Sequence, residues 1–261
     1  SYRKYLGSGA PVYNNPGWTI NEQDNPNNVE RFIVSPELNW KIRDNINIVA
    51  KYGLDYYTDH RETYFPVNSA AGLGTGSFSQ SDIQNKVENI NVFAQSSHTL
   101  TDKIDLDVVV GTNFFRNQYS VIGGSSAIFT NPDLGDLRIF GNATSDNETP
   151  SKFIQETRKH GVYGVFNFNV ADQLYVELTG RVERPSTLEK NIFSPSASVG
   201  WKFSQLLDDS ILSFGKLRAS YGEVGIEPGA YASSTTYSPG GITSSWGDGL
   251  TAANYGNPFT R

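Results

Sequence analysis

Histidine is the side chain most often used for proton transfer near neutral pH, and this chain has three histidines, at positions 60, 98 and 160. They are far apart in the sequence, and none has partners at a spacing that would indicate a nucleophile, base and acid working together. We therefore expect each histidine to lie in a loop or at a strand rim. The sequence predicts no catalytic residues and a protein that is not an enzyme.

Three aspartates lie close together at positions 102, 105 and 107, which is a spacing that could suggest calcium. The segment lacks the glycine and the final glutamate of an EF-hand loop, so a lumen-facing or periplasmic-rim position is the better interpretation. The chain has no cysteine, which excludes thiolate metal sites and disulfides. The glycine-rich stretch 72–76 is followed by no Lys-Ser/Thr pair and is expected to be a loop tip, not a phosphate cradle. The sequence predicts no metal and no cofactor.

Binding is the better prospect, because aromatic residues stand among Asn, Ser and Gly in the long connections between the expected strands. Flat apolar rings with fixed polar groups are what a sugar or peptide site uses. The candidate binding residues are Trp18, Tyr64, Phe65, Phe129, Phe140, Tyr231, Tyr237 and Trp246. Two alternatives remain open for each ring, namely packing of loop against loop and an outer aromatic belt. Residues 229–255 are the best single region, and they could equally contact a partner subunit.

Composition indicates the kind of fold that must position these aromatic residues. Only 37% of residues are hydrophobic, yet aromatics reach 13% and there are 25 glycines, a combination typical of a transmembrane β-barrel. No run is long and apolar enough for a transmembrane helix, and no signal peptide is recognisable. The absence of methionine predicts a processed chain or an internal piece. The net charge of −6 argues against nucleic acid as a partner.

Four pairs of segments alternate between apolar and polar residues with the period of two expected of strands. The pairs are 32–42 with 46–54, 88–96 with 104–114, 162–170 with 174–182, and 193–203 with 212–221. In the last segment the alternation changes phase at Gly215, which predicts a β-bulge there. Charged side chains occupy the polar phase and would be costly against lipid, so we expect that phase to face the lumen.

The connections also sort by length. Those within pairs are short, whereas 56–86 and 116–159 between pairs are long, 185–192 is shorter, and 1–31 and 223–261 are expected to be further long loops. Short turns at one end and long loops at the other are the asymmetry of an outer-membrane barrel. The predicted fold is therefore all-β, an antiparallel transmembrane β-barrel with short periplasmic turns and long extracellular loops.

Residues Phe193–Gly225 carry the pattern F-x-P-S-x-S-x-G-W-x-F followed by G-K-L-R-A-S-Y-G. This stretch resembles the SusC/RagA-like family of TonB-dependent outer-membrane transporters of Bacteroidetes. Residues 13–33 resemble the family's entry into a barrel strand, and Gly256-Asn257-Pro258 resembles the start of another. Residues 179–187 keep the family's Gly-Arg but lack its Asp.

The resemblance implies that residues 1–261 supply about eight strands of a barrel of about 22 strands. The plug domain and the TonB box of such a transporter are absent from this chain. The implied function is TonB-dependent import of oligosaccharides or peptides, as the barrel subunit of a SusCD-like complex in the outer membrane of a Gram-negative bacterium. The implied partners are a SusD-like surface lipoprotein, outer-membrane lipid, and TonB through a segment not in this chain.

Two other functions compete with import. A small, complete eight-stranded barrel could act as an adhesin or structural protein, although residues 257–261 do not resemble a closing strand. An outer-membrane hydrolase would need acid and base residues gathered at the loop rim, and the scattered histidines disfavour it.

Overall fold

The protein is described by a computed structural model over residues 3–5, 11–70, 74–206, 214–242, 245–247, 249–254 and 256. Parts of three sequence motifs lie outside the described residues: Gly72 and Leu73 of the glycine-rich stretch, Leu212 and Ser213 of the family pattern, and Asn257 and Pro258 near the end. The longest helix described, α1 (Pro16–Glu22), is a short one, and no helix in these ranges has the length and apolarity to cross a membrane.

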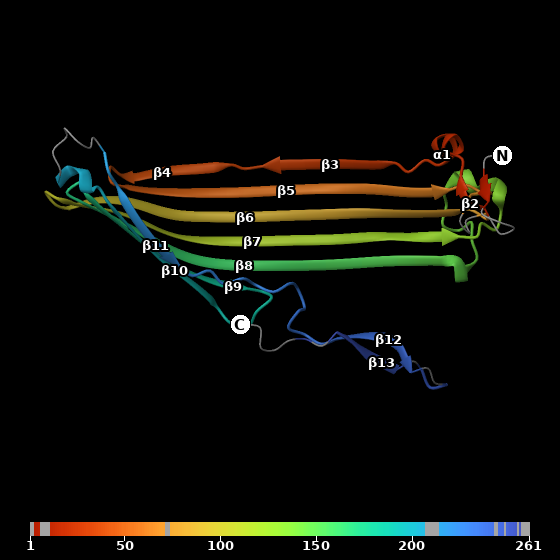
Figure 1. Ribbon diagram of the computed structural model, residues 1–261. Helices are drawn as coiled ribbons and strands as arrows, with labels where there is room; N and C mark the ends of the chain where they lie inside the picture. Colours follow the sequence, from red (N-terminus) through yellow and green to blue (C-terminus); the bar gives the residue numbers. More distant parts are fainter. Residues whose placement is uncertain are drawn as a thin grey trace. The chain divides into compact units, whose positions relative to one another are not determined.

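A nine-stranded antiparallel sheet dominates the described part of the chain, in the order β11-β10-β9-β8-β7-β6-β5-β3, with β4 also paired to β5 (Figure 1). Its strands are β3 (Asn27–Val34), β4 (Glu37–Arg43), β5 (Ile46–Phe65), β6 (Ser77–Thr101), β7 (Ile104–Ala127), β8 (Glu148–Val170), β9 (Leu174–Pro185), β10 (Ile192–Trp201) and β11 (Leu217–Gly222). The remaining elements are β1 (Arg3–Tyr5) with β2 (Pro11–Asn14), β12 (Thr236–Ile242) with β13 (Gly249–Asn254), and the 3-10 turns η1 (Pro132–Leu137), η2 (Ser145–Asn147) and η3 (Phe203–Leu206). The all-β antiparallel prediction is confirmed.

One predicted strand is divided in two. Where the alternation of 32–42 predicts a continuous strand, β3 ends at Val34 and β4 begins at Glu37. Pro36 stands in the gap, and proline has no N–H to donate to a ladder. Its carbonyl still accepts a hydrogen bond from the Tyr52 amide at 3.1 Å, so the neighbouring strand β5 passes the break without interruption.

The strands are much longer than the sequence predicts. The expected loops 56–86 and 116–159 are wrong in extent, because β5 runs on to Phe65, β6 starts at Ser77, β7 reaches Ala127 and β8 starts at Glu148. The apolar alternation stops near residues 54, 88, 114 and 162, but backbone pairing does not. Both faces of these extensions carry polar residues, so they lack the pattern by which a strand is usually recognised.

The turns at the other end agree with the prediction of short connections. Two residues, Asp44-Asn45, join β4 to β5, and another two, Asp102-Lys103, join β6 to β7. The β8–β9 turn places Ala171 and Asp172 at φ 54° and 55°, as a type I′ hairpin requires of its two central residues. The expected bulge at Gly215 is wrong, because Gly215 lies before β11 and the described register of β10 with β11 is regular.

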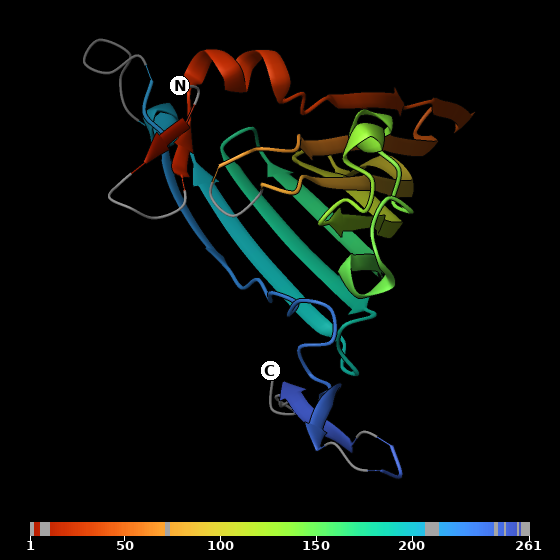
Figure 2. The ribbon, with the colours of Figure 1, turned by 90° about the vertical axis from the view of Figure 1, so that its right-hand side faces the viewer.

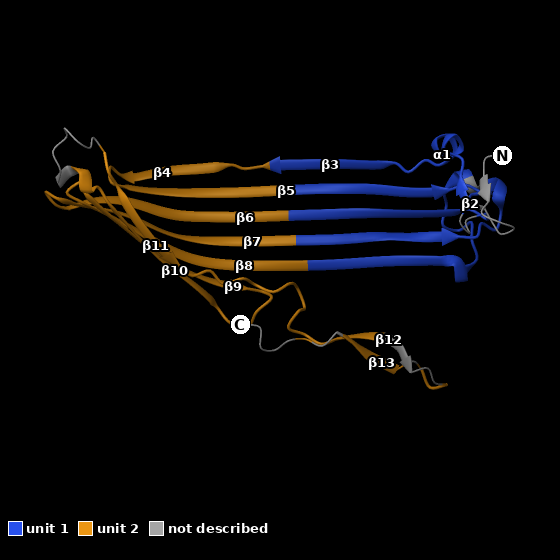
Figure 3. Cartoon of the chain, viewed as in Figure 1, with its two compact units in different colours: residues 1–33, 55–86, 118–155 blue, residues 34–54, 87–117, 156–261 orange. Residues whose placement is uncertain are grey.

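The described residues form two compact units (Figure 3). Unit 1 comprises residues 1–33, 55–86 and 118–155, and unit 2 comprises residues 34–54, 87–117 and 156–261. Strands β5, β6, β7 and β8 each contribute one segment to either unit. Unit 1 also holds α1, η1 and η2, whereas unit 2 also holds β4 and β9 to β13.

In unit 2 one face of the sheet is apolar and exposed. The register places Val162 opposite Val182, Phe166 opposite Leu178, and Phe193 opposite Val182 on the next strand. These side chains are between 40% and 62% exposed, together with Ile90, Val110, Phe114 and Val199 on the same face. β8, β9 and β10, green to cyan in Figure 2, lie side by side here. Such a face suits contact with hydrocarbon.

Unit 1 has instead a small buried core. Tyr64, Phe78 and Phe129 form it, with exposed fractions of 4%, 2% and 6%, and Phe140 packs on Phe78 with ring centroids 5.3 Å apart. Gly76 beside it has φ +80°, and a Cβ there would lie 2.4 Å from the Phe129 ring. Only glycine fits that position, so the chain enters β6 directly beneath the Phe129 ring.

Candidate functional site

The candidate site is built on the segments of β5, β7 and β8 in unit 1, on the side opposite the buried core. Side chains alternate along a strand, so the odd positions of β5 in unit 1 share one face. These positions include Tyr57, Asp59 and Arg61. Tyr57 and Tyr119 both lie close enough to Arg61 to act on its charge, which places the three side chains on one surface. We call this surface the inner face of unit 1.

Asp59 is the most constrained residue of this face. It is 6% exposed, and its Oδ2 accepts hydrogen bonds from Arg61 Nε at 2.9 Å and from Arg61 Nη2 at 2.5 Å. Its other oxygen, Oδ1, is buried and has no hydrogen-bond partner among the described residues. A buried carboxylate oxygen without a donor is costly, so Asp59 is held in this position at the expense of stability.

Aromatic rings and a second ion pair complete the inner face. Tyr119 on β7 and Phe153 on β8 meet edge to face with centroids 6.2 Å apart, and Phe153 is 51% exposed. Arg31 on β3 donates two hydrogen bonds to Asp55, from Nε to Oδ1 at 2.8 Å and from Nη2 to Oδ2 at 2.5 Å. The face therefore offers flat apolar rings beside fixed charges of both signs, which suits binding of a polar organic ligand better than catalysis.

The connection 128–147 folds onto unit 1 and is held by charge. Arg138 Nη1 donates to Glu62 Oε2 and Arg138 Nη2 to Asp24 Oδ2, both at 3.0 Å, and its guanidinium lies 5.0 Å from the Tyr64 ring centroid. Tyr64 Oη donates to Asp136 Oδ1 at 2.9 Å. Burial and the Asp136 carboxylate raise the pKa of Tyr64 to about 12, so the hydroxyl remains protonated at any physiological pH.

His60 extends this network. Its Nδ1 lies 2.5 Å from Asp82 Oδ1, and its Nε2 lies 3.2 Å from Glu62 Oε1. The hydrogen bonds to Asp82 and then Glu62 raise the pKa of His60 above its usual value, while the same bonds lower the pKa of each carboxyl group. His60 thus stabilises two carboxylates, and it lies within strand β5 and not in the loop that the sequence predicted.

The aromatic residues predicted for binding occupy different environments in unit 1. Tyr64 and Phe129 are buried in the core, so for these two rings the structure agrees with the alternative in which they pack loop against loop. Phe140 packs on the core yet stays 36% exposed. Trp18 is half-buried in α1, and Phe65 is half-buried at the end of β5. The structure brings Tyr64, Phe129 and Phe140 together, and their role in ligand contact stays a prediction.

The other predicted aromatics belong to unit 2. Tyr231 and Tyr237 are 62% and 64% exposed, the latter on β12, and Trp246 is 97% exposed. Tyr231 has φ 62°, an uncommon value for a residue other than glycine. Three exposed rings within residues 229–255 are compatible with either a ligand or a partner subunit, so this part of the prediction also stays open.

The remaining chemical candidates contact neighbouring hydroxyl groups, and His160 does so within β8 and not in a loop. Asp105 accepts a hydrogen bond from Thr99 Oγ1 at 3.0 Å, and Asp107 accepts one from Ser97 Oγ at 2.6 Å. His98 Nε2 lies 3.1 Å from Ser96 Oγ. His160 Nε2 lies 2.9 Å from Thr112 Oγ1. Neighbouring hydroxyls thus engage two of the three aspartates and two of the three histidines.

Sequence reasoning missed Tyr57, Asp59, Arg61, Tyr119 and Phe153, because it placed them in loops. One signal was present: Tyr57, Asp59 and Arg61 continue the phase of Lys51 and Asp55, the polar positions of the preceding predicted strand. Extending this alternation past residue 55 places the three side chains on the face expected to line the lumen.

Comparison with known proteins agrees with this architecture. The family model described as "TonB dependent receptor-like, beta-barrel" matches residues 1–259. The TonB-dependent receptor P3 of Formosa agariphila is 21% identical over 188 residues, which is 70% of this chain and 19% of that protein.

Solved structures show the same fold. The RagAB peptide transporter aligns with a TM-score of 0.84 and 16% identity, and the RagAB peptide importer in its open-open state with 0.81 and 16%. Each alignment covers 99% of this chain and 29% of the other. The chain thus spans less than a third of the length of these relatives. The resemblance first seen in Phe193–Gly225 is confirmed.

Proposed function

We propose, because this chain belongs to the TonB-dependent receptor β-barrel family, that it forms part of the wall of an importer of oligosaccharides or peptides. The family is one of outer-membrane transporters of Gram-negative bacteria and not of enzymes. The observation that carries the proposal is the two-faced sheet. Unit 2 exposes an apolar face fit for lipid, whereas unit 1 presents charges and rings on its inner face.

Of the two substrate classes, the inner face of unit 1 favours peptides. Peptides carry ammonium, carboxylate and amide groups, and this face offers the exposed guanidinium groups of Arg31 and Arg61, the partly exposed carboxylate of Asp55, and exposed aromatic surface. The RagAB structures with which the fold agrees are described as a peptide importer, which supports the same choice.

The whole importer requires parts beyond this chain. Residues 1–261 would belong to the barrel domain, with the plug and the TonB-binding segment elsewhere in the protein. A SusD-like surface lipoprotein is the proposed partner, in keeping with the two-component name of RagAB. The exposed rings of residues 229–255 are a proposed contact for that partner or for the substrate.

Uptake by whole cells tests the proposal. The probes are a fluorescently labelled tryptic digest of casein and a labelled maltodextrin mixture, supplied to cells with the intact gene, without it, and with a protonophore. We expect peptide uptake to need both the gene and the proton gradient. Peptide and maltodextrin uptake that are both independent of the gene would overturn the import proposal.

Substitutions on the inner face then test the site. Asp59→Asn and Arg61→Gln should each reduce peptide uptake at least tenfold, because Arg61 presents its charge to the ligand and Asp59 holds that guanidinium in place. Thr58→Ala is the matched control, since Thr58 directly precedes Asp59 on β5 in the opposite phase. Unchanged uptake in both variants, with normal amounts of folded protein, would contradict the role of this face while leaving import standing.

The adhesin alternative finds less support. A complete eight-stranded barrel requires its first and last strands to pair. Among the described residues, β3 and β4 lie at one end of the sheet order and β11 lies at the other, and these ends are not paired with each other.

A further inference from the structure

The apolar face of unit 2 ends in a row of basic residues. On β9 the apolar phase runs from Leu174 to Val182 and the next residue in phase is Arg184. On β8 it runs back from Val170 to Val162 and the next residue is His160. Each run covers nine positions, which is the length of a tilted strand that crosses hydrocarbon. Arg184 and His160 therefore lie where the hydrocarbon should end.

The register fixes these side chains on the lipid side. Val162 pairs with Val182, and His160 pairs with Arg184 two residues further along the same two strands. Residues two apart share a face, so His160 and Arg184 project on the side of the two exposed valines. Arg158 continues the row on β8 and its side chain is 66% exposed.

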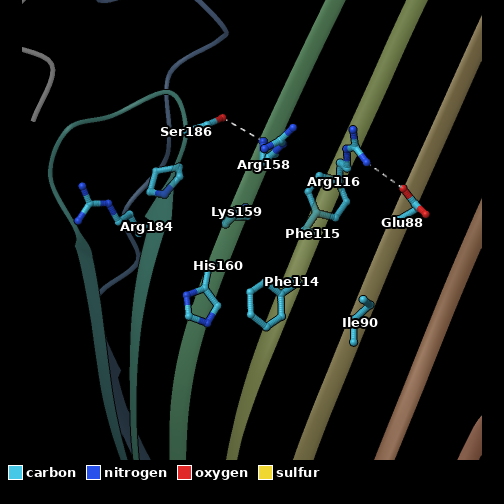
Figure 4. A pocket seen from close by; sticks show the side chains of 11 residues that line it. Glu88, Ile90, Phe114, Phe115, Arg116, Arg158, Lys159, His160, Arg184 and Ser186 are labelled. Atoms are coloured by element: carbon cyan, nitrogen blue, oxygen red, sulfur yellow. Dashed lines mark hydrogen bonds and ion pairs between the residues drawn. The ribbon is translucent and has the colours of Figure 1, made fainter.

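A groove of about 700 Å³ runs along this row (Figure 4). Its wall combines the apolar side chains Ile90 and Phe114 with cations from three strands, Arg116, Arg158 and Arg184. His160 stacks on Phe114 with ring centroids 4.2 Å apart, and Thr112 Oγ1 lies 2.9 Å from its Nε2. The imidazole is thus held in place, and the groove is preformed.

Charges in the groove do not balance. Arg116 donates to Glu156 at 3.0 Å and 3.2 Å and lies 3.8 Å from Glu88, and Arg158 shares Glu156. Lys159 also lines the groove and pairs with Glu227 at 3.0 Å, so four cations face three carboxylates. Arg184 is exposed and has no ion pair among the described residues. The surplus is positive, at a surface whose other border is apolar.

We propose that this groove binds the phosphate-bearing headgroup of a membrane lipid, in the leaflet on the long-loop side. Arg158 and Arg184 would hold the phosphate, since guanidinium groups bind phosphate oxygens in pairs, and the acyl chains would lie on Val162 and Val182. Charge complementarity selects this occupant, because basic groups beside hydrocarbon attract anionic lipid headgroups. The inference rests on the outer-membrane location given by the family and not on import.

Native mass spectrometry of the intact protein, extracted in detergent, tests the proposal. The probe is dioleoyl phosphatidic acid, compared with dioleoylglycerol, which lacks the phosphate, and with inorganic phosphate. We expect adducts with phosphatidic acid only. The double variant Arg158→Gln with Arg184→Gln should retain at least tenfold less of it, whereas lysine at both positions should keep most of the binding.

Two further variants make the test specific. Arg218→Gln removes a charge on β11 from the opposite phase, between Leu217 and Ala219, and should retain lipid as the parent does. Val182→Asn should weaken phosphatidic acid binding severalfold, because it removes part of the acyl surface. Equal lipid retention in the glutamine and parent proteins overturns the proposal. So does displacement of the lipid by millimolar inorganic phosphate, which would indicate a free-phosphate site.

Discussion

Units 1 and 2 share four strands, β5 to β8, but the same alternating positions of those strands have different surroundings in the two units. In unit 2 the even positions of β8, such as Val162 and Phe166, are apolar and exposed. In unit 1 the even positions of β5 and β6 carry His60, Tyr64 and Phe78, which are hydrogen bonded or buried under the connection 128–147. Backbone pairing sets how far a strand runs, whereas the medium on each side sets which residues it carries.

The largest expected effect is the loss of the core of unit 1. Phe78→Ala should lower the stability of that unit by about 3–5 kcal/mol, because it opens a cavity between Tyr64 and Phe129. Hydrogen exchange of the intact protein in lipid nanodiscs should then accelerate in residues 77–82 and stay unchanged in 174–182. Equal acceleration in both ranges would show that the units do not respond separately.

A charge introduced on the apolar face should destabilise unit 2. Leu178→Arg should lower the free energy of unfolding in lipid vesicles by about 2–4 kcal/mol, because the guanidinium would face hydrocarbon. Ile122→Arg is the matched control in unit 1, at a side chain that is 55% exposed, and should cost less than about 1 kcal/mol. Urea titration measures both. Similar costs would remove the distinction between the two faces.

A smaller effect comes from one buried hydroxyl. Tyr64→Phe should cost about 1–3 kcal/mol in unit 1, because the Asp136 carboxylate loses its 2.9 Å donor. The ring and its packing on the core remain, so exchange should accelerate in residues 132–138 without opening β6. Faster exchange across β6 would contradict this, because it would show that the core also depends on the hydroxyl and not on ring packing alone.

The smallest effect is a dependence on pH that belongs to unit 1. The pKa of His60 is raised by its carboxylate partners, so its contribution is complete below the unfolded pKa of about 6.5 and is lost as pH rises through the folded value. Opening of residues 58–62, corrected for intrinsic exchange rates, should be rarer at pH 6 than at pH 8. His60→Gln should abolish the difference, and an unaltered difference would assign it to another group.

Sequence alone predicted the sheet of unit 2 well and that of unit 1 poorly. Where lipid faces one side, apolar and polar residues must alternate, so pairs such as 162–170 with 174–182 could be read directly. Past residue 55, Tyr57 and Arg61 alternate with Thr58 and His60, and neither set is apolar throughout. The strand continues there through backbone hydrogen bonds, which do not require alternation of apolar and polar side chains and so cannot be predicted from it.

The candidate site shows the same limit. Aromatic content pointed to Tyr64, Phe129 and Phe140, and the structure does bring them together. The sequence could not show that two of the three rings are buried, because their burial depends on Phe78 and on a connection that is distant in sequence and packs against them. Asp59, whose free oxygen makes it notable, has no sequence signature, because its isolation arises from its neighbours on other strands.

The continuation of β5 to β8 into unit 1 has a consequence for digestion of intact cells. A protease must draw several residues of extended, unpaired chain into its cleft, and a residue in a hydrogen-bonded ladder is withheld from it. Segments 55–65, 77–86, 118–127 and 148–155 are all in strands, and Arg138 ties the connection 128–147 to Glu62 and Asp24. Cell-surface shaving should therefore release few peptides from this region, and a region rich in polar residues would be underrepresented in surface proteomes.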